Sequence, residues 1–149
     1  MLSRFVIGVL GFAAGAGWFL TTTNAQPARR YINARSAADP AAAKQPPFSG
    51  GVLVGDTLYL SGVLGTGDTA EAAATAALTS IQNVLKAAGM TMDDLVSVQV
   101  FTPDVANYDG FNTAYRKFFK QEYPARAFLG SGPLLNAARF EVMGTAVRR

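Results

Sequence analysis

Residues 51–61 read GVLVGDTLYLS, two apolar and β-favouring runs on either side of Gly55-Asp56. A two-residue connection that places glycine at a positive φ is typical of a tight β-hairpin. The stretch therefore predicts a hairpin of two strands, Gly51 to Val54 and Thr57 to Ser61, and the other elements follow outward from it.

A glycine-rich loop, Gly62 to Gly67, follows the hairpin and leads into a helix that should end at Gly89. Asp68 and Glu71 have the spacing of a capping box at the start of this helix. Small and aliphatic residues recur along it at helical spacing: Ala74, Ala77, Leu78, Ile81, Leu85 and Ala88. A face of this kind packs closely against a sheet.

The C-terminal half predicts a second helix and three strands. The strands are expected at 96–101, 125–129 and 138–147, of which the first and last alternate between apolar and polar residues. The helix is expected at 108–119, with Asn112 among aromatic residues on one side. The order of elements predicts an α+β fold. Because two helices cover only one face of the sheet, the other face is expected to be buried in an oligomer whose sheets face one another.

The composition excludes several kinds of chemistry. The chain contains no cysteine and no histidine, so disulfides, thiol nucleophiles, Ser-His-Asp triads and the usual zinc sites are ruled out. Its 13 Lys and Arg against 10 Asp and Glu are mostly scattered. We therefore expect no nucleic-acid partner.

The N-terminus has the pattern of an export signal. Arg4 precedes the apolar run Phe5 to Leu20, and Ala25 closes a small-residue cleavage motif. We predict a signal peptide over 1–25, which implies a periplasmic or secreted protein. The alternative is an uncleaved membrane anchor, but the run is shorter than the roughly 20 residues that span a bilayer. Residues 26–46 are expected to form a linker, in which Arg30 to Asn33 can form a short edge strand, and 47–149 the domain.

Three polar residues are candidates for chemistry, and each also has an ordinary structural explanation. Arg126 and Glu141 would by default be solvated strand residues, and Asn112 could bridge backbone groups in the core. The loop Gly62 to Gly67 lacks the Gly-Lys-Ser/Thr ending of a phosphate loop and is better explained as a turn.

Together, these residues belong to a longer pattern. In order, the chain contains PFS (47–49), VGDTLYLSG (54–62), KAAG (86–89), VQVF (98–101), FNTAY (111–115), FF (118–119), PAR (124–126) and FEV (140–142). In this order and spacing it resembles the Rid family of enamine/imine deaminases, also called YjgF or L-PSP endoribonuclease-like, from about Arg30 to Arg149. The resemblance implies a chorismate-mutase-like mixed sheet with two helices on one face, and a homotrimer with clefts at the subunit interfaces.

The resemblance also implies roles for individual residues. Arg126 would hold the carboxylate of a small 2-imino or enamino acid through paired hydrogen bonds. Glu141 would deprotonate the water that attacks the C=N carbon, so that ammonia leaves and a 2-oxo acid remains. Asn112 and backbone groups at Gly62 would line the same cleft, and no cofactor or metal is required.

The chain departs from the family pattern at several positions. Phe48 stands where many members have tyrosine, Phe128 where they have a small residue, and Val63 where they have glutamine. These changes predict a narrower and more apolar cleft around the substrate. They leave two functions open, imine hydrolysis and a non-catalytic module that binds small carboxylates. RNA cleavage ranks below both, because histidine and a basic stripe are missing.

Overall fold

The computed structural model of the protein describes residues 27–33 and 46–149. The predicted signal at 1–25 and most of the predicted linker lie outside the described residues. The strands are β1 (Arg29–Ile32), β2 (Gly51–Val54), β3 (Thr57–Gly65), β4 (Leu95–Thr102), β5 (Ala125–Gly130) and β6 (Phe140–Val147). The helices are α1 (Ala70–Ala88) and α2 (Tyr108–Tyr115), with short 3₁₀ turns η2 (Met92–Asp94), η3 (Val105–Asn107), η4 (Arg116–Phe118) and η5 (Leu135–Ala137).

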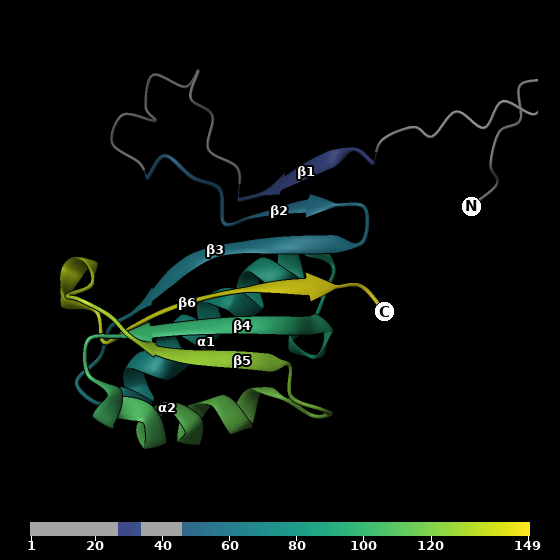
Figure 1. The fold of residues 1–149 in the computed structure, drawn as a ribbon. Helices are drawn as coiled ribbons and strands as arrows, with labels where there is room; N and C mark the ends of the chain where they lie inside the picture. The colour runs from purple at the N-terminus through teal and green to yellow at the C-terminus, as the bar shows by residue number, and fades with distance from the viewer. Residues whose placement is uncertain (1–26, 34–45) are drawn as a thin grey trace, which may run out of the picture.

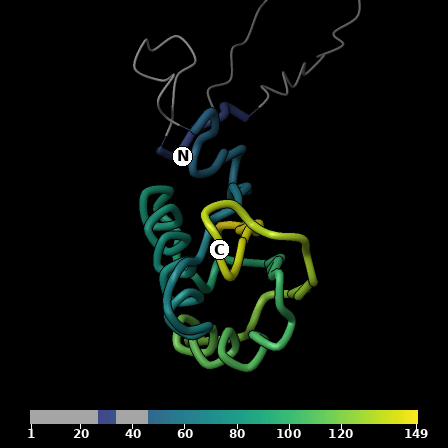
Figure 2. The backbone as a smooth tube through the Cα atoms, turned by 90° about the vertical axis from the view of Figure 1, so that its left-hand side faces the viewer, coloured from purple at the N-terminus to yellow at the C-terminus, as the bar shows by residue number. Residues whose placement is uncertain are grey.

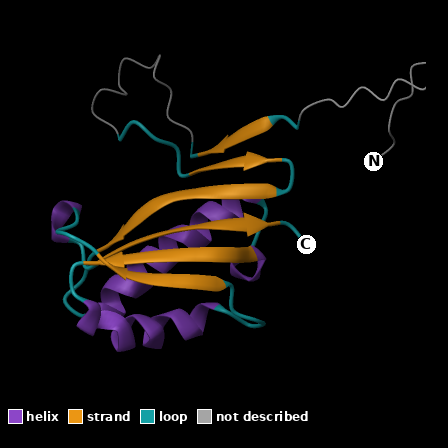
Figure 3. Cartoon of the chain, viewed as in Figure 1, coloured by secondary structure: helices purple, strands orange, loops and turns teal. Residues whose placement is uncertain are grey.

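The six strands form one mixed sheet in the order β1-β2-β3-β6-β4-β5 (Figure 3). All neighbouring pairs are antiparallel except β4 and β5, which are parallel. The predicted hairpin is confirmed, since β2 pairs with β3 across a turn in which Gly55 has a φ of 58°. The loop predicted to begin at Gly62 is wrong for residues 62–65, because β3 continues to Gly65 and pairs there with β6. The strand expected near Arg30 is β1, which lies at the edge of the sheet.

Helix α1 begins and ends through different kinds of cap. Its N-cap is Thr69, whose side-chain oxygen accepts a hydrogen bond from the Ala72 backbone N–H at 3.1 Å. The capping box predicted at Asp68 is therefore wrong by one residue. The predicted end is confirmed, because Gly89 adopts a φ of 77° and its N–H donates to the Leu85 and Lys86 carbonyls. A left-handed residue at this position favours glycine.

Helix α2 is shorter than predicted. It ends at Tyr115 and tightens into η4, after which Phe119 is extended. This arrangement brings the Phe119 ring to 4.7 Å from the Tyr115 ring. The aromatic face of α2 therefore continues beyond the helix as a cluster of packed rings.

Both helices lie on the same face of the sheet, and the core lies between (Figures 1 and 2). The largest fully buried side chains there include Leu58, Leu78, Leu85, Phe111 and Phe140. This confirms the expected α+β architecture. Among the described residues, no helix is both long enough and apolar enough to cross a membrane.

No helix within residues 27–33 and 46–149 covers the other face of the sheet. Tyr59, Leu129 and Val147 are exposed large apolar residues on this face, and Phe101 is half-buried. Exposed apolar side chains on an uncovered sheet face are candidates for an interaction surface. The oligomer predicted from the sequence would cover this open face.

Candidate functional site

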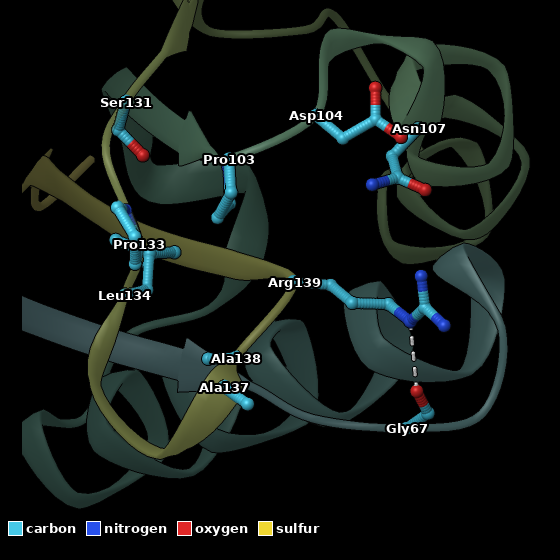
Figure 4. Close-up of a pocket in the computed structure, with 10 residues that line it drawn as sticks. All are labelled: Gly67, Pro103, Asp104, Asn107, Ser131, Pro133, Leu134, Ala137, Ala138 and Arg139. Carbon is cyan, nitrogen blue, oxygen red and sulfur yellow. Dashed lines mark hydrogen bonds between the residues drawn. The ribbon is translucent and has the colours of Figure 1, made fainter.

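Two depressions in the surface are candidates for a functional site. The larger, about 590 Å³, lies where β4 and β5 end and is lined by Gly67, Pro103, Asp104, Asn107, Ser131, Pro133, Leu134, Ala137, Ala138 and Arg139 (Figure 4). The smaller, about 310 Å³, lies between the start of β5 and α2 and is lined by Tyr108, Asn112, Tyr115, Arg116, Tyr123, Pro124 and Arg126. Volume alone would favour the larger one, but its chemistry does not.

The charged side chains of the larger depression form hydrogen bonds with the backbone around it. Arg139 donates from Nε to the Gly67 carbonyl at 3.0 Å (Figure 4). It also donates from Nη2 to the Asp68 carbonyl at 3.0 Å. The Asp104 carboxylate accepts from the Ala106 backbone N–H at 2.9 Å and so caps η3. Because both charged side chains already have structural partners, we assign the candidate site to the smaller pocket.

Arg126 dominates the smaller pocket. It pairs in register with the buried Val98 of β4, so its side chain lies on the helix-covered face of the sheet. Its Cζ lies 4.6 Å from the ring centroid of Tyr115, 5.6 Å from that of Phe111 and 5.7 Å from that of Tyr108. These rings attract the cation without using its N–H donors.

No carboxylate in the described part of the chain lies within ion-pair distance of the Arg126 guanidinium. A guanidinium offers five N–H donors in a planar fork that fits a carboxylate. The pocket therefore presents a cation packed between rings, with no acidic partner among the described residues. Its geometry suits a small anion.

Helix α2 supplies the rest of the pocket from one face. Tyr108, Asn112 and Tyr115 are four and three residues apart, so they lie on the same side of the helix. The Asn112 side chain is only 7% exposed and can both donate and accept hydrogen bonds. The buried amide of Asn112 thus lines the same pocket as the Arg126 cation.

Tyr115 also lines this pocket, whereas the sequence predicts it only as part of the aromatic face of the helix. It is 4% exposed, and its hydroxyl has no hydrogen-bond partner among the described residues. Burial raises the pKa of Tyr115 to about 12, although the charge of Arg126 acts in the opposite direction. The hydroxyl therefore remains protonated at neutral pH. The sequence feature that could have indicated a role for Tyr115 is the presence of tyrosine, rather than phenylalanine, on a buried helix face.

Glu141 and Gly62 lie elsewhere in the protomer. In β6, Glu141 is in register with Phe101 of β4 and Leu64 of β3, which places its side chain on the open face of the sheet. A Cβ added to Gly62 would coincide with the Glu141 carboxylate, so these two residues are in contact. One protomer therefore does not bring Glu141 together with Arg126 and Asn112.

Phe48 lies on the side of the molecule that carries Gly62. It is 53% exposed and precedes Ser49, whose carbonyl accepts a hydrogen bond from the Ser61 hydroxyl at 2.7 Å. The candidate residues thus form two groups. Arg126 and Asn112 line the pocket between β5 and α2, whereas Glu141 and Gly62 are on the open side of the sheet.

Phe128 belongs to the aromatic cluster behind the pocket. Its ring lies 5.1 Å from Tyr108, 5.6 Å from Phe111 and 6.3 Å from Phe140. It is not among the residues that line the pocket. Within a protomer, it supports the ring of Tyr108 rather than narrowing the space beside Arg126.

Residues 27–33 and 46–149 contain no group of three or more Asp or Glu side chains placed to hold a metal ion. No Asp or Glu is among the residues that line the smaller pocket, and Glu141 lies on the other face of the sheet. The chemistry of this pocket therefore has to be derived from its cation, amide and phenol groups.

Comparisons with known proteins agree with this fold. A family model described as Endoribonuclease L-PSP matches residues 36–148. A 2-iminobutanoate/2-iminopropanoate deaminase from Bos taurus is 35% identical over 111 residues, covering 68% of this chain and 80% of the relative. The protein of the same description from Homo sapiens is 32% identical with the same coverage.

Solved structures show the same architecture. The YjgF gene product of E. coli aligns with a TM-score of 0.68 and 26% identity, covering 70% of this chain and 91% of that one. A YjgF family member from Neisseria meningitidis aligns with a TM-score of 0.72 and 22% identity, covering 84% and 98%. The second comparison supports the fold alone.

Proposed function

Because the chain belongs to the endoribonuclease L-PSP family, also called the YjgF or RutC family, we propose that it hydrolyses small 2-imino and enamino acids to 2-oxo acids and ammonia. The observation that carries the proposal is the Arg126 guanidinium, which is held by three rings and has no acidic partner in the described part of the chain. The imino acids in the names of the curated relatives carry the carboxylate that such a cation would bind.

Arg126 would bind the substrate carboxylate through two parallel hydrogen bonds. The rings of Tyr108, Phe111 and Tyr115 restrict the guanidinium, so little side-chain freedom remains to be lost when the ligand binds. Asn112 would contact the polar atoms next to the carboxylate. This arrangement would hold the adjacent C=N carbon in one orientation for attack by water.

The base would come from a second protomer. We propose a homotrimer in which the open sheet face is covered and Glu141, with Gly62 and Phe48, faces Arg126 of a neighbouring subunit. The exposed apolar residues Tyr59 and Leu129 support burial of this face. A composite site would also explain why Glu141 and Arg126 are on opposite faces of one sheet.

In this mechanism, Glu141 accepts a proton from water while the water oxygen forms a bond to the imine carbon. The C=N double bond becomes a single bond, and the nitrogen is protonated to give a carbinolamine. The hydroxyl of the carbinolamine then loses its proton, which is passed to the amino nitrogen. Its oxygen forms the C=O double bond as the C–N bond breaks, and ammonia leaves. One water is consumed per imine, and Glu141 returns to its starting state after relaying the proton.

One observation favours a second function, the binding of small carboxylates without turnover. Arg126, Asn112 and Tyr115 are already together within one protomer, whereas Glu141 is not among them. A protein that assembles without bringing Glu141 to the pocket would retain the carboxylate site and lack the base.

We also propose, from the sequence of residues 1–25, that the protein is exported. Under this proposal the imine is met in the periplasm or outside the cell. An exported fusion of these residues to a reporter enzyme would support it, and retention of the fusion inside the cell would contradict it.

The two functions are separated by direct kinetics. An amino-acid oxidase generates 2-iminopropanoate or 2-iminobutanoate, and the loss of the imine is followed with and without the purified protein. We expect acceleration by the wild type, none by Arg126→Ala and a slower reaction by Glu141→Gln. Arg29→Ala is the matched control, because Arg29 is an exposed cation on β1. No acceleration by the wild type, with retained binding of a 2-oxo acid, would support the binding module.

A further inference from the structure

The Tyr115 hydroxyl is the buried polar group whose position the fold does not explain. Its side chain is more than nine-tenths buried and lines the pocket beside Arg126. Its oxygen has no hydrogen-bond partner among the described residues. Buried hydroxyls are nearly always paired, so an exception at the wall of a pocket points to a ligand.

Packing accounts for the ring of Tyr115 but not for its hydroxyl. The ring stacks on Phe111 at 5.5 Å and contacts Phe119 at 4.7 Å. Phenylalanine would make the same ring contacts, and the chain uses phenylalanine for both neighbours. The phenolic oxygen therefore adds an unpaired polar atom with no gain in packing.

We propose that Tyr115 is a substrate-binding residue whose hydroxyl donates a hydrogen bond to the carboxylate held by Arg126. This inference rests on the proposed function and extends it. The Arg126 Cζ lies 4.6 Å from the Tyr115 ring centroid, so one small anion can reach both side chains. Because burial raises the pKa of Tyr115 to about 12, its hydroxyl is a neutral donor at the pH of the reaction.

Tyr123 controls access to this hydroxyl. The Tyr115 oxygen is shielded in the empty pocket, and the ring of Tyr123 stacks beside Tyr115 with 6.1 Å between centroids. Tyr123 is 57% exposed and also meets Phe119 with 5.6 Å between ring centroids, so turning toward solvent costs its ring these two contacts. We expect the ligand to displace this ring as it enters.

The test is Tyr115→Phe, with 2-oxobutanoate as a stable carboxylate probe. Calorimetric titration of the intact protein should show that affinity falls about tenfold, as expected for loss of a hydrogen bond to a charged group. With 2-iminobutanoate, KM should rise more than kcat falls. Tyr31→Phe removes an exposed tyrosine hydroxyl on β1 and should bind like the wild type.

Two outcomes would overturn the inference about Tyr115. One is unchanged affinity in Tyr115→Phe, and the other is weaker binding accompanied by a lower melting temperature, which would make the hydroxyl structural. Arg126→Ala separates this failure from failure of the proposed function. If Arg126→Ala loses binding while Tyr115→Phe retains it, only the role of Tyr115 is wrong. If both variants retain binding, the carboxylate site itself is wrong.

Discussion

Replacing Gly62 with alanine tests where the Glu141 carboxylate has to lie. Gly62 is at the irregularity in β3 where the pairing with β6 shifts register. An added Cβ would overlap the Oε1 atom of Glu141 and lie 3.0 Å from its Cδ and 3.2 Å from its Cγ. Carbon atoms pack best at about 3.5 to 4.0 Å, so the carboxylate has to swing away.

The expected effect falls on catalysis and not on folding. Gly62 does not have a positive φ, and the group that must move is the end of a flexible side chain. Displacing a catalytic group by about 1 Å costs roughly 100-fold in rate. We therefore expect kcat to fall by roughly 100-fold, whereas KM should stay within about twofold because the carboxylate anchor is unchanged.

The assay is steady-state hydrolysis of 2-iminopropanoate, with thermal unfolding and size-exclusion chromatography on the same samples. Gly132→Ala is the matched control, because a Cβ at Gly132 would meet open space, and it should retain the wild-type kcat. A folded Gly62→Ala protein with the wild-type oligomeric state and an unchanged kcat would refute the assignment of Glu141 as the base.

Three further predictions concern stability and assembly. The Tyr115 pKa is about 12 in the folded protein and about 10 in the unfolded chain. The protonated hydroxyl therefore makes its full contribution to the free energy of unfolding below pH 10, and this contribution is lost as pH rises toward 12. By pH 11 the free energy of unfolding should have fallen about 1 kcal/mol more in the wild type than in Tyr115→Phe, measured by urea denaturation; parallel pH curves would contradict this. Phe111→Ala should lower the free energy of unfolding by about 3 to 5 kcal/mol, because the ring is fully buried, and a loss under 1 kcal/mol would show that the α2 cluster is not part of the core. Leu129→Lys, on the open face, should shift sedimentation from trimer to monomer with little change in far-UV circular dichroism, and an unaltered trimer would place the interface elsewhere.

The local features of the fold could be predicted from the sequence because short-range chemistry determines them. The Gly55-Asp56 turn and the glycine at the end of α1 are examples, since few residues suit those backbone conformations. The N-cap of α1 is Thr69 and not the predicted Asp68, because both residue types are good caps and only their backbone geometry distinguishes them. The end of α2 was missed because 3₁₀ and α-helical turns have similar sequence patterns.

The candidate site could be predicted only in part because it depends on strand register. Alternation along β5 puts Arg126 and Phe128 on one face, but their position relative to α2 follows from the pairing of Arg126 with Val98. A shift of one residue would place Arg126 on the open face with Glu141. Nothing local in the sequence sets this long-range register. That the Tyr115 hydroxyl has no hydrogen-bond partner among the described residues likewise can be recognised only in the folded structure, where the surrounding side chains are in place.

The most direct test of a site shared between protomers is complementation between two inactive variants. Arg126→Ala keeps Glu141, and Glu141→Gln keeps Arg126, so each homotrimer should have little imine hydrolase activity. If the two are mixed in equal amounts, unfolded and reassembled, about a quarter of the sites in a random cyclic trimer should combine both wild-type residues. We predict recovery of about a quarter of the wild-type kcat per protomer. A reassembled mixture that stays as inactive as its parents would show that Arg126 and Glu141 do not act together across an interface.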